Sequence, residues 1–266
     1  MNEATPRVSV IIRCCNEEQH IGRLLSGILE QTLREVEIIV VDSGSTDATL
    51  AIASRYPVHI RHIAREAFSF GRSLNVGCAA ARGEFLVMAS AHVYPIYRDW
   101  LEKLIAPFAH PEVAVVYGQQ RGDERTKYAE QQIFEKLYPV GGMQITPGWF
   151  CNNANAAVRR ALWTELPYDE ALTGLEDLAW AKAIGQRGLR VAYQGEAGVI
   201  HVHDEHWRQV LNRYRREAIA LKRIAPEEHF GLVDFFTCLA RNVVSDLRHA
   251  QRDARLREVW LSVLQF

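Results

Sequence analysis

The sequence predicts an α/β protein whose core is a doubly wound, mainly parallel sheet, followed by a helical C-terminal extension. In about the first 118 residues, short apolar runs alternate with segments of helical periodicity. The apolar runs show no polar alternation, which is typical of strands buried on both faces by helices. The chain has 266 residues, of which 48% are hydrophobic and 24% are charged. That length and composition fit one large globular domain with an appendage.

Each strand is expected at an apolar run, and each helix in the segment that follows. The expected strands are residues 8–12, 36–42, 58–63, 85–88 and 113–118. The expected helices are residues 16–31, 45–56, 71–81 and 99–108, which show helical apolar spacing or open with capping residues. Ligands of such sheets bind beyond the carboxyl ends of the strands, so we expect the functional residues there.

Composition excludes several classes of protein. The net charge of −1 gives no sign of a nucleic-acid partner. The five cysteines are odd in number and form no C-x-x-C pair, which argues against a disulfide framework and a structural zinc site. The N-terminus lacks the layout of a signal peptide, and no apolar run approaches the ~18 residues that span a bilayer. We therefore expect a soluble protein of the cytoplasm.

The turn after the first expected strand contains Asn16, Glu17 and Glu18. No glycine occurs between Val8 and Ile21, which argues against a dinucleotide-binding dehydrogenase. The polar residues of this turn either cap the next helix or contact a ligand.

The second expected strand ends at Asp42, followed by Gly44 and Ser45. This pattern is typical of a tight turn that opens a helix. An acid at this strand end can also accept hydrogen bonds from a ribose or a base edge, so both interpretations stay open.

VSVIIRCCNEE and VEIIVVDSGSTDAT together resemble the opening of the family 2 glycosyltransferases, whose nucleotide-sugar-binding fold is the Rossmann-like GT-A type. The resemblance continues through FGRSLNVGCAAARGEFLVMASAH, CNNANAAVRRALWTELPYDE, TGLEDLAWAKAIGQRG and VIHVHDEHW. The chain departs from the family at Cys15, usually aromatic, and at Ser43, often a second Asp. The resemblance implies a catalytic domain over residues 1–224 and a helical appendage over residues 225–266. The donor-binding residues that it implies are Asn16, Glu17, Asp42, Ser45, Arg72, Asn75 and Ser90.

A metal site is implied at the end of the fourth expected strand. Most enzymes of this fold carry D-x-D there, and polypeptide N-acetylgalactosaminyltransferases carry D-x-H, which Ser90-Ala91-His92 resembles. The second metal-binding histidine of those relatives comes late in the domain, where this chain has His201 and His203. Imidazole suits Mn²⁺ better than Mg²⁺. The alternatives are a transferase that needs no metal and a plain strand end.

Glu176 and Asp177 could simply stabilise the positive end of a helix. In the resembling family, the acid at this place removes the proton of the acceptor hydroxyl, and Asp177 is the better match, with Glu176 in support. The resemblance therefore implies an inverting glycosyltransferase of cell-surface polysaccharide or glycoconjugate synthesis. The expected donor is a UDP- or dTDP-sugar, and the expected acceptor is a glycan or a lipid-linked glycan.

Two other functions are considered. HVHDEH approaches the H-x-H-x-D-H run of two-zinc metallohydrolases, but it follows a complete α/β pattern instead of preceding it. A nucleotide-sugar-binding protein without catalysis is also admissible, because Ser90 replaces an acid. If residues 201–203 are extended, His201 and His203 point to opposite faces, and one of them serves packing.

Residues 205–224 form an expected amphipathic helix with six Arg and Lys against two Glu. Such a helix is either a solvated surface helix or a peripheral contact with the inner face of a membrane. Processive family members carry Q-x-x-R-W here, whereas this chain has Gln209 followed by Arg213-Tyr214. We therefore expect single transfers.

Overall fold

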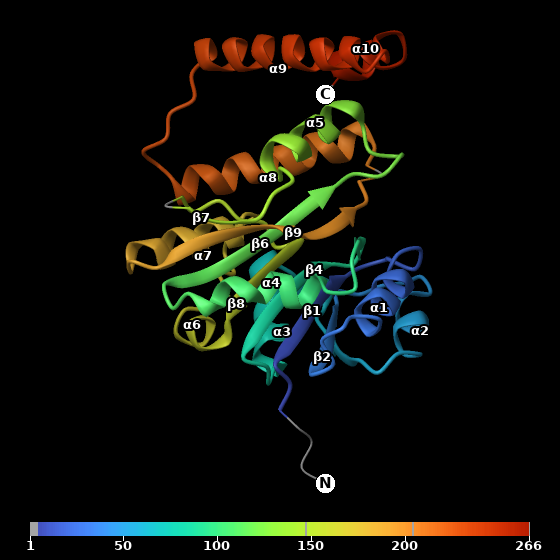
Figure 1. The fold of residues 1–266 in the computed structure, drawn as a ribbon, viewed down its shortest axis with the longest axis vertical. Coiled ribbons are helices and arrows are strands. Elements are labelled where there is room, and N and C mark those ends of the chain that lie inside the picture. Colours follow the sequence, from blue (N-terminus) through green and yellow to red (C-terminus); the bar gives the residue numbers. More distant parts are fainter. Residues whose placement is uncertain (1–4, 147, 204, 266) are drawn as a thin grey trace.

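The computed structural model describes residues 5–146, 148–203 and 205–265, and within them nine strands form one sheet flanked by helices (Figure 1). The strands are β1 (Val8–Cys14), β2 (Val36–Asp42), β3 (His59–His62), β4 (Phe85–Ser90), β5 (Val93–Pro95), β6 (Val113–Arg121), β7 (Met143–Thr146), β8 (Asn155–Arg159) and β9 (Arg190–His201). The α-helices are α1 (Ile21–Leu29), α2 (Thr49–Ala53), α3 (Phe70–Ala80), α4 (Trp100–Ile105), α5 (Tyr128–Leu137), α6 (Arg160–Glu165), α7 (Glu176–Gln186), α8 (Trp207–Ile224), α9 (Leu232–Arg252) and α10 (Leu256–Gln265). Two 3-10 helices are η1 (Arg65–Ala67) and η2 (Ala106–Ala109).

The N-terminal half of the sheet is parallel, as predicted. Strand β1 lies between β2 and β4, and β3 pairs with the outer side of β2, all in the same direction. Along β1, Val10 and Ile12 face a core that includes α1 and α4, whereas Ile11 faces a second core that includes α3 and α7. Helices therefore cover both faces, which confirms the doubly wound arrangement. The edge strand β3 is largely exposed, so burial on both faces does not extend to it.

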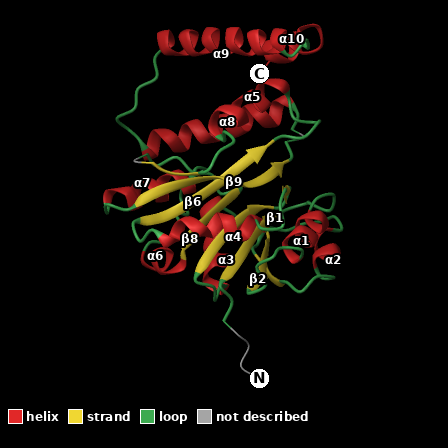
Figure 2. Cartoon of the chain, viewed as in Figure 1, coloured by secondary structure: helices red, strands yellow, loops and turns green. Residues whose placement is uncertain are grey.

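The C-terminal half of the sheet is mixed, which corrects the expectation of a mainly parallel sheet. Strand β8 runs antiparallel to both β4 and β6, whereas β6 and β9 are parallel. The short strands β5 and β7 add antiparallel pairs to β9, which itself runs beside β6 (Figure 2). Strand β8 enters the middle of the sheet, between β4 and β6.

Helices α1 and α2 begin later than predicted, because the segments before them form loops that are hydrogen-bonded to each other. The backbone N–H of Asn16 donates to Ser45 Oγ at 2.9 Å, and Thr46 N–H donates to Asn16 Oδ1 at 2.8 Å. Glu17 N–H donates to Thr49 Oγ1 at 2.7 Å. These bonds hold the two loops side by side at the carboxyl edge of the sheet.

Helix α3 lies close against β1, and a glycine permits this. A Cβ atom at Gly77 would stand 2.5 Å from Ile11 Cγ2. The close approach fixes the segment that leads into β4, and β4 in turn carries Ser90 at its end.

The C-terminal helices lie outside the sheet. Helix α9 packs against α10, and α10 packs against α5. Figure 1 shows α9 standing apart from the sheet. None of the described helices is both long and apolar enough to cross a membrane.

Candidate active site

A cleft of 730 Å³ opens at the carboxyl ends of β1 and β4, between the loop before α1, the start of α7 and the segment that leads from β9 into α8. Eight of the residues implied by sequence line it: Asn16, Glu17, Ser90, His92, Glu176, Asp177, His201 and His203. The structure therefore brings together residues that lie up to 187 positions apart in the chain, the separation of Asn16 and His203.

A buried carboxylate pair lies at the start of α7. Arg13 at the end of β1 donates from Nη1 to Glu176 Oε1 at 3.0 Å and to the carbonyl oxygen of Phe70 at 3.1 Å. Among the described residues, no cation pairs with Asp177, and its two oxygens accept from the backbone N–H groups of Asn153 at 2.8 Å and Leu178 at 2.9 Å. Glu176 is therefore paired with a cationic side chain, whereas Asp177 accepts hydrogen bonds from backbone N–H groups.

Asp177 takes up a proton more readily than an ordinary aspartate, because its pKa is raised. Burial, together with the negative charge of Glu176, raises the pKa of Asp177 to about 7, although the two backbone hydrogen bonds oppose the shift. A carboxylate with such a pKa accepts a proton near neutral pH far more readily than an exposed one.

The turn before α7 is strained. Gly174 has φ +159° and Leu175 has φ +56°, a left-handed conformation that costs a residue with a Cβ about 1 kcal/mol or more. Non-glycine residues adopt it chiefly where the surrounding structure imposes it. Here it delivers Glu176 and Asp177 to the cleft.

Three histidines form a row across the other side of the cleft. The rings of His92 and His201 stack with centroids 5.1 Å apart, and those of His201 and His203 lie 4.1 Å apart. Each Nδ1 lies at hydrogen-bonding distance from an oxygen: His92 from Glu17 Oε1 at 2.9 Å, His201 from Gln120 Oε1 at 2.7 Å and His203 from Glu130 Oε1 at 2.6 Å. We assign the Nδ1–H tautomer to all three, which leaves each Nε2 with a free lone pair.

The facing Nε2 atoms of His201 and His203 suit a first-row divalent cation, whereas His92 does not form a group with both in which one ligand nitrogen of each residue lies within 4.8 Å of the others. His201 Nε2 and His203 Nε2 face each other at 3.2 Å. Two nitrogens bound to one ion at about 2.1 Å, with an angle near 100° between them, lie about 3.2 Å apart. Burial and the neighbouring His203 and His92 hold the pKa of His201 well below its ordinary value, so its ring is neutral, as a ligand must be.

A carboxylate from α5 supports the row of histidines. Glu130 is 2% exposed, and Arg213 Nη2 donates to its Oε1 at 2.7 Å. Burial opposes the ionisation of Glu130, but His203 and Arg213 outweigh it and lower its pKa. Ligand atoms of Glu130, His203 and Glu205 lie within 4.8 Å of one another, yet Arg213 already pairs with both carboxylates, also reaching Glu205 Oε2 at 2.8 Å. We therefore assign Glu130 to the support of His203 and not to direct metal binding.

His201 and His203 do not point to opposite faces, as they would if residues 201–203 were extended. Strand β9 ends at His201, and the two rings meet. Asp204 of the same motif lies outside the described residues. His201 ends β9, the last described strand along the chain, and His203 follows it, so they do not have the early position of the two-zinc hydrolase motif.

Four residues implied as donor ligands do not line the cleft. Asp42 is 2% exposed, and its carboxylate accepts the backbone N–H groups of Gly44 at 3.0 Å and Ser45 at 3.1 Å. It therefore organises its own turn, and Ser45 accepts from Asn16 as described above. Arg72 is exposed on α3, outside the cleft lining.

Asn75 has a structural task. Its amide nitrogen donates to Tyr168 O and Glu170 Oε1, and its amide oxygen accepts from Trp163 Nε1 and Tyr168 N–H. Every hydrogen-bonding position of this amide is used. Asn75 thus fixes the segment after α6, and its amide has no free hydrogen-bonding position for a nucleotide sugar.

Several residues of the site were not found from the sequence. Arg13, Gln120 and Glu130 lie on separate elements and orient Glu176, His201 and His203. One indication of a role for Arg13 was present in the sequence, because this charged residue interrupts an apolar strand just before the turn of Asn16 and Glu17. The sequence contains no such indication for Gln120 or Glu130.

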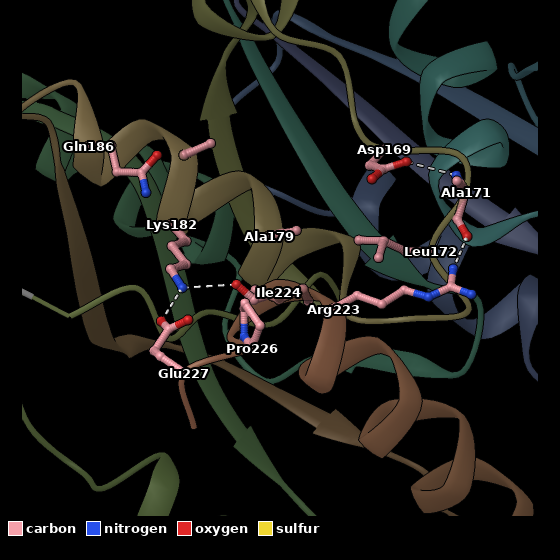
Figure 3. A pocket seen from close by; sticks show the side chains of 11 residues that line it. Asp169, Ala171, Leu172, Ala179, Lys182, Gln186, Arg223, Ile224, Pro226 and Glu227 are labelled. Carbon is pink, nitrogen blue, oxygen red and sulfur yellow. Dashed lines mark hydrogen bonds and ion pairs between the residues drawn. The ribbon is translucent and has the colours of Figure 1, made fainter. Parts of the chain in front are cut away.

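A second pocket, of 560 Å³, lies between α7 and the end of α8 (Figure 3). Lys182 pairs with Glu227 at 2.7 Å and donates to the carbonyl oxygen of Ile224, and Arg223 donates to that of Ala171. Both cations that line the pocket are thus used within the chain. The pocket is best explained as the junction that fixes the end of α8.

The chain is similar to known sugar transferases. A sequence model described as glycosyl transferase family 2 matches residues 9–162. The O-antigen chain rhamnosyltransferase WbaN of Salmonella anatum is 28% identical over 197 residues, which are 70% of this chain and 62% of WbaN. The O-antigen chain rhamnosyltransferase RfbN of Salmonella typhimurium is 27% identical over 221 residues, which are 78% of this chain and 70% of RfbN.

Among solved structures, the mannosyltransferase PcManGT of Pyrobaculum calidifontis, in complex with GDP-Man and Mn²⁺, has a TM-score of 0.65 and 22% identity. The match covers 97% of this chain and 74% of that one, and it shows a shared GT-A fold. The family match includes more than half of the residues and contains the β1 end and the Ser90–His92 turn of the cleft. This chain therefore belongs to glycosyl transferase family 2.

Proposed function

We propose that this chain is an inverting glycosyltransferase that moves a sugar from a nucleotide diphosphate donor to a hydroxyl acceptor, in the synthesis of a cell-surface glycan. The observation that carries the proposal is the buried carboxylate of Asp177, which lines the cleft, forms no ion pair with a cation in the described parts of the chain and has a raised pKa. Family membership and the two rhamnosyltransferase relatives support the class of reaction.

Asp177 is the proposed base. The acceptor oxygen bonds to the anomeric carbon of the sugar while the bond from that carbon to the diphosphate oxygen breaks, and the acceptor proton passes to Asp177. The displacement occurs on the face opposite the leaving group, so the configuration inverts. The carboxylate of Glu176, ion-paired with Arg13, lies beside Asp177 and adds to the effect of burial in raising the pKa of Asp177.

His92, His201 and His203 are the proposed ligands of a divalent cation, and Mn²⁺ suits their nitrogens better than Mg²⁺. The Mn²⁺ in the mannosyltransferase complex supports a cation in this fold. When bound, such an ion neutralises charge on a departing diphosphate. Ser90 contributes a neutral hydroxyl in place of a charged ligand.

The donor is proposed to bind along the loop of Asn16 and Glu17, with a uridine or thymidine base. Asp42 acts on this region through the turn that it organises, so its substitution would loosen the loop. The proposed acceptor is a glycan or a lipid-linked glycan.

The first test compares Asp177→Asn with Asp169→Asn, an exposed acid outside the cleft. We expect Asp177→Asn to lower the transfer rate by about 10²- to 10⁴-fold and to leave UDP affinity within a few-fold, because an amide cannot accept the proton. The control should transfer normally. Near-parental transfer by Asp177→Asn would place the base elsewhere.

The second test concerns His92. Addition of Mn²⁺ with UDP should raise the melting temperature of the parent, because a ligand of the folded state stabilises it. His92→Ala should lack the Mn²⁺-dependent part of this shift. A full shift in the variant would remove His92 from the metal site. Donor binding with no hydrolysis or transfer under any condition would favour a binding protein without catalysis.

A further inference from the structure

Asn153 lines the cleft with a side-chain amide that the protein itself does not use. The residue is 5% exposed, and its amide nitrogen is buried without a hydrogen-bond partner among the described residues. The amide oxygen accepts no hydrogen bond from this part of the chain either. Buried polar side chains are hydrogen-bonded as a rule, because an unpaired one has lost its contacts with water and gained nothing in return. An exception that lines a cleft is therefore expected to find its partner in a ligand.

Asn155, two positions along the chain, shows the ordinary case. It is 0% exposed, and its amide nitrogen donates to the carbonyl oxygens of Gln119 at 3.0 Å and Ala197 at 2.8 Å. Its amide oxygen accepts from Trp100 Nε1 at 2.9 Å. Both ends of this amide thus serve the fold, whereas neither end of the Asn153 amide does.

The backbone around Asn153 joins the two ends of the proposed reaction centre. On one side, the carbonyl oxygen of Ala154 accepts from the backbone N–H of Ser90, at the end of β4, at 3.3 Å. That strand end leads directly to His92 and the proposed cation. On the other side, the backbone N–H of Asn153 donates to Asp177 Oδ2, on the proposed base, at 2.8 Å.

An inverting displacement determines where the transferred sugar lies. The acceptor oxygen attacks the anomeric carbon on the face opposite the leaving diphosphate, so these three groups stand in one line. The diphosphate lies at the cation, and the acceptor oxygen lies at the base. The sugar therefore occupies the space between the two, and the segment that carries Asn153 spans the same interval.

We propose that Asn153 binds the sugar that is transferred, through two neighbouring hydroxyl groups of its ring; this inference rests on the proposed function of the cleft. A side-chain amide offers a hydrogen-bond donor and an acceptor side by side, and two adjacent hydroxyl groups can pair with both. Because neither end of the amide is held within the protein, it can turn about its terminal torsion to meet the pair. A donor sugar that lacks one of these hydroxyl groups would leave the amide unpaired and bind less well.

The first experiment is calorimetry with Mn²⁺ and four donors, namely UDP-glucose, UDP-galactose, dTDP-rhamnose and GDP-mannose, each beside its free nucleoside diphosphate. For a donor that the parent binds, Asn153→Ala should weaken binding about tenfold and change the affinity of the free nucleotide by less than about twofold, because only hydrogen bonds to the sugar are lost. Alanine keeps the backbone N–H that Asp177 accepts, so the base stays in place. The matched control is Asn212→Ala, an exposed asparagine of α8 outside the cleft lining, which should bind as the parent does.

The second experiment measures melting without any ligand. Asn153→Ala should melt at or above the parental temperature, because it removes a buried polar group that has no partner. Asn155→Ala should melt about 5–10 °C lower, because it leaves three buried groups unpaired. A fall of that size in Asn153→Ala would show that Asn153 serves the fold, and it would overturn this inference while leaving the proposed base and cation intact. Parental donor affinity in Asn153→Ala would overturn it equally, whereas a parent that binds none of the four donors would refute the proposed function and this inference with it.

Discussion

The raised pKa of Asp177 makes a prediction about folding that does not depend on knowing the substrate. In the unfolded chain this carboxyl ionises near 3.8, whereas in the folded protein its pKa is about 7, because burial and Glu176 disfavour the charge. Between these values the folded state holds a proton that the unfolded state has lost. The free energy of unfolding therefore rises as the pH falls through 7 toward 3.8.

The magnitude follows from the linkage between protons and stability. One proton held only by the folded state changes the free energy of unfolding by about 1.4 kcal/mol per pH unit. From about pH 7 to about pH 5.5, Asp177 should thus contribute a gain of about 2 kcal/mol. Above about pH 8 both states are ionised and the contribution should be constant.

The assay is urea unfolding of the parent and of Asp177→Asn at a series of pH values. The variant cannot take up the proton, and it loses one carboxylate acceptor at every pH, so it should show a constant offset without the gain. Other groups, such as His201 with its lowered pKa, titrate in both proteins and cancel in the difference. Parallel pH profiles for the two proteins would refute the argument, because they would mean that Asp177 ionises as an exposed carboxyl does.

Two further predictions concern the support of the site and the core. Glu130→Gln should weaken Mn²⁺ binding, measured by calorimetry, by about 10- to 100-fold, because His203 loses the carboxylate that orients it. Glu135→Gln, a change of an exposed residue on the same helix, should bind Mn²⁺ as the parent does. Equal Mn²⁺ affinities of Glu130→Gln and the parent would contradict the assignment of Glu130. Gly77→Ala should lower the free energy of unfolding in urea by about 1–3 kcal/mol, because its Cβ would stand 2.5 Å from Ile11. Gly185→Ala, in open space on α7, should raise the free energy of unfolding by about 0.5–1 kcal/mol. An unchanged free energy of unfolding in Gly77→Ala would show that α3 can move away from β1.

The sequence by itself determined the first half of the fold and most of the cleft. The apolar runs that became β1, β2 and β4 lack polar alternation, and only a sheet covered on both faces can bury such strands. Polar residues that follow these runs must then lie at one edge, so Asn16, Glu17, Ser90 and His92 could be placed together before the structure was known. The mixed second half was not predictable in this way, because β5 and β7 are short. The antiparallel direction of β8 follows from its pairing with β4 and β6, which the sequence pattern does not reveal.

Only the tertiary structure decided which polar groups serve the site and which serve the fold. Asn75 and Asp42 look like donor ligands in the sequence, yet their hydrogen-bonding positions are taken by Tyr168 and by the turn of Gly44. Conversely, Glu130 has no signal of its own, and it orients His203 because α5 and α8 pack together and bring Arg213, 83 residues away, to the same carboxylate. Such assignments depend on pairing between distant segments, and burial then fixes each polar group to the partner that packing brings within reach.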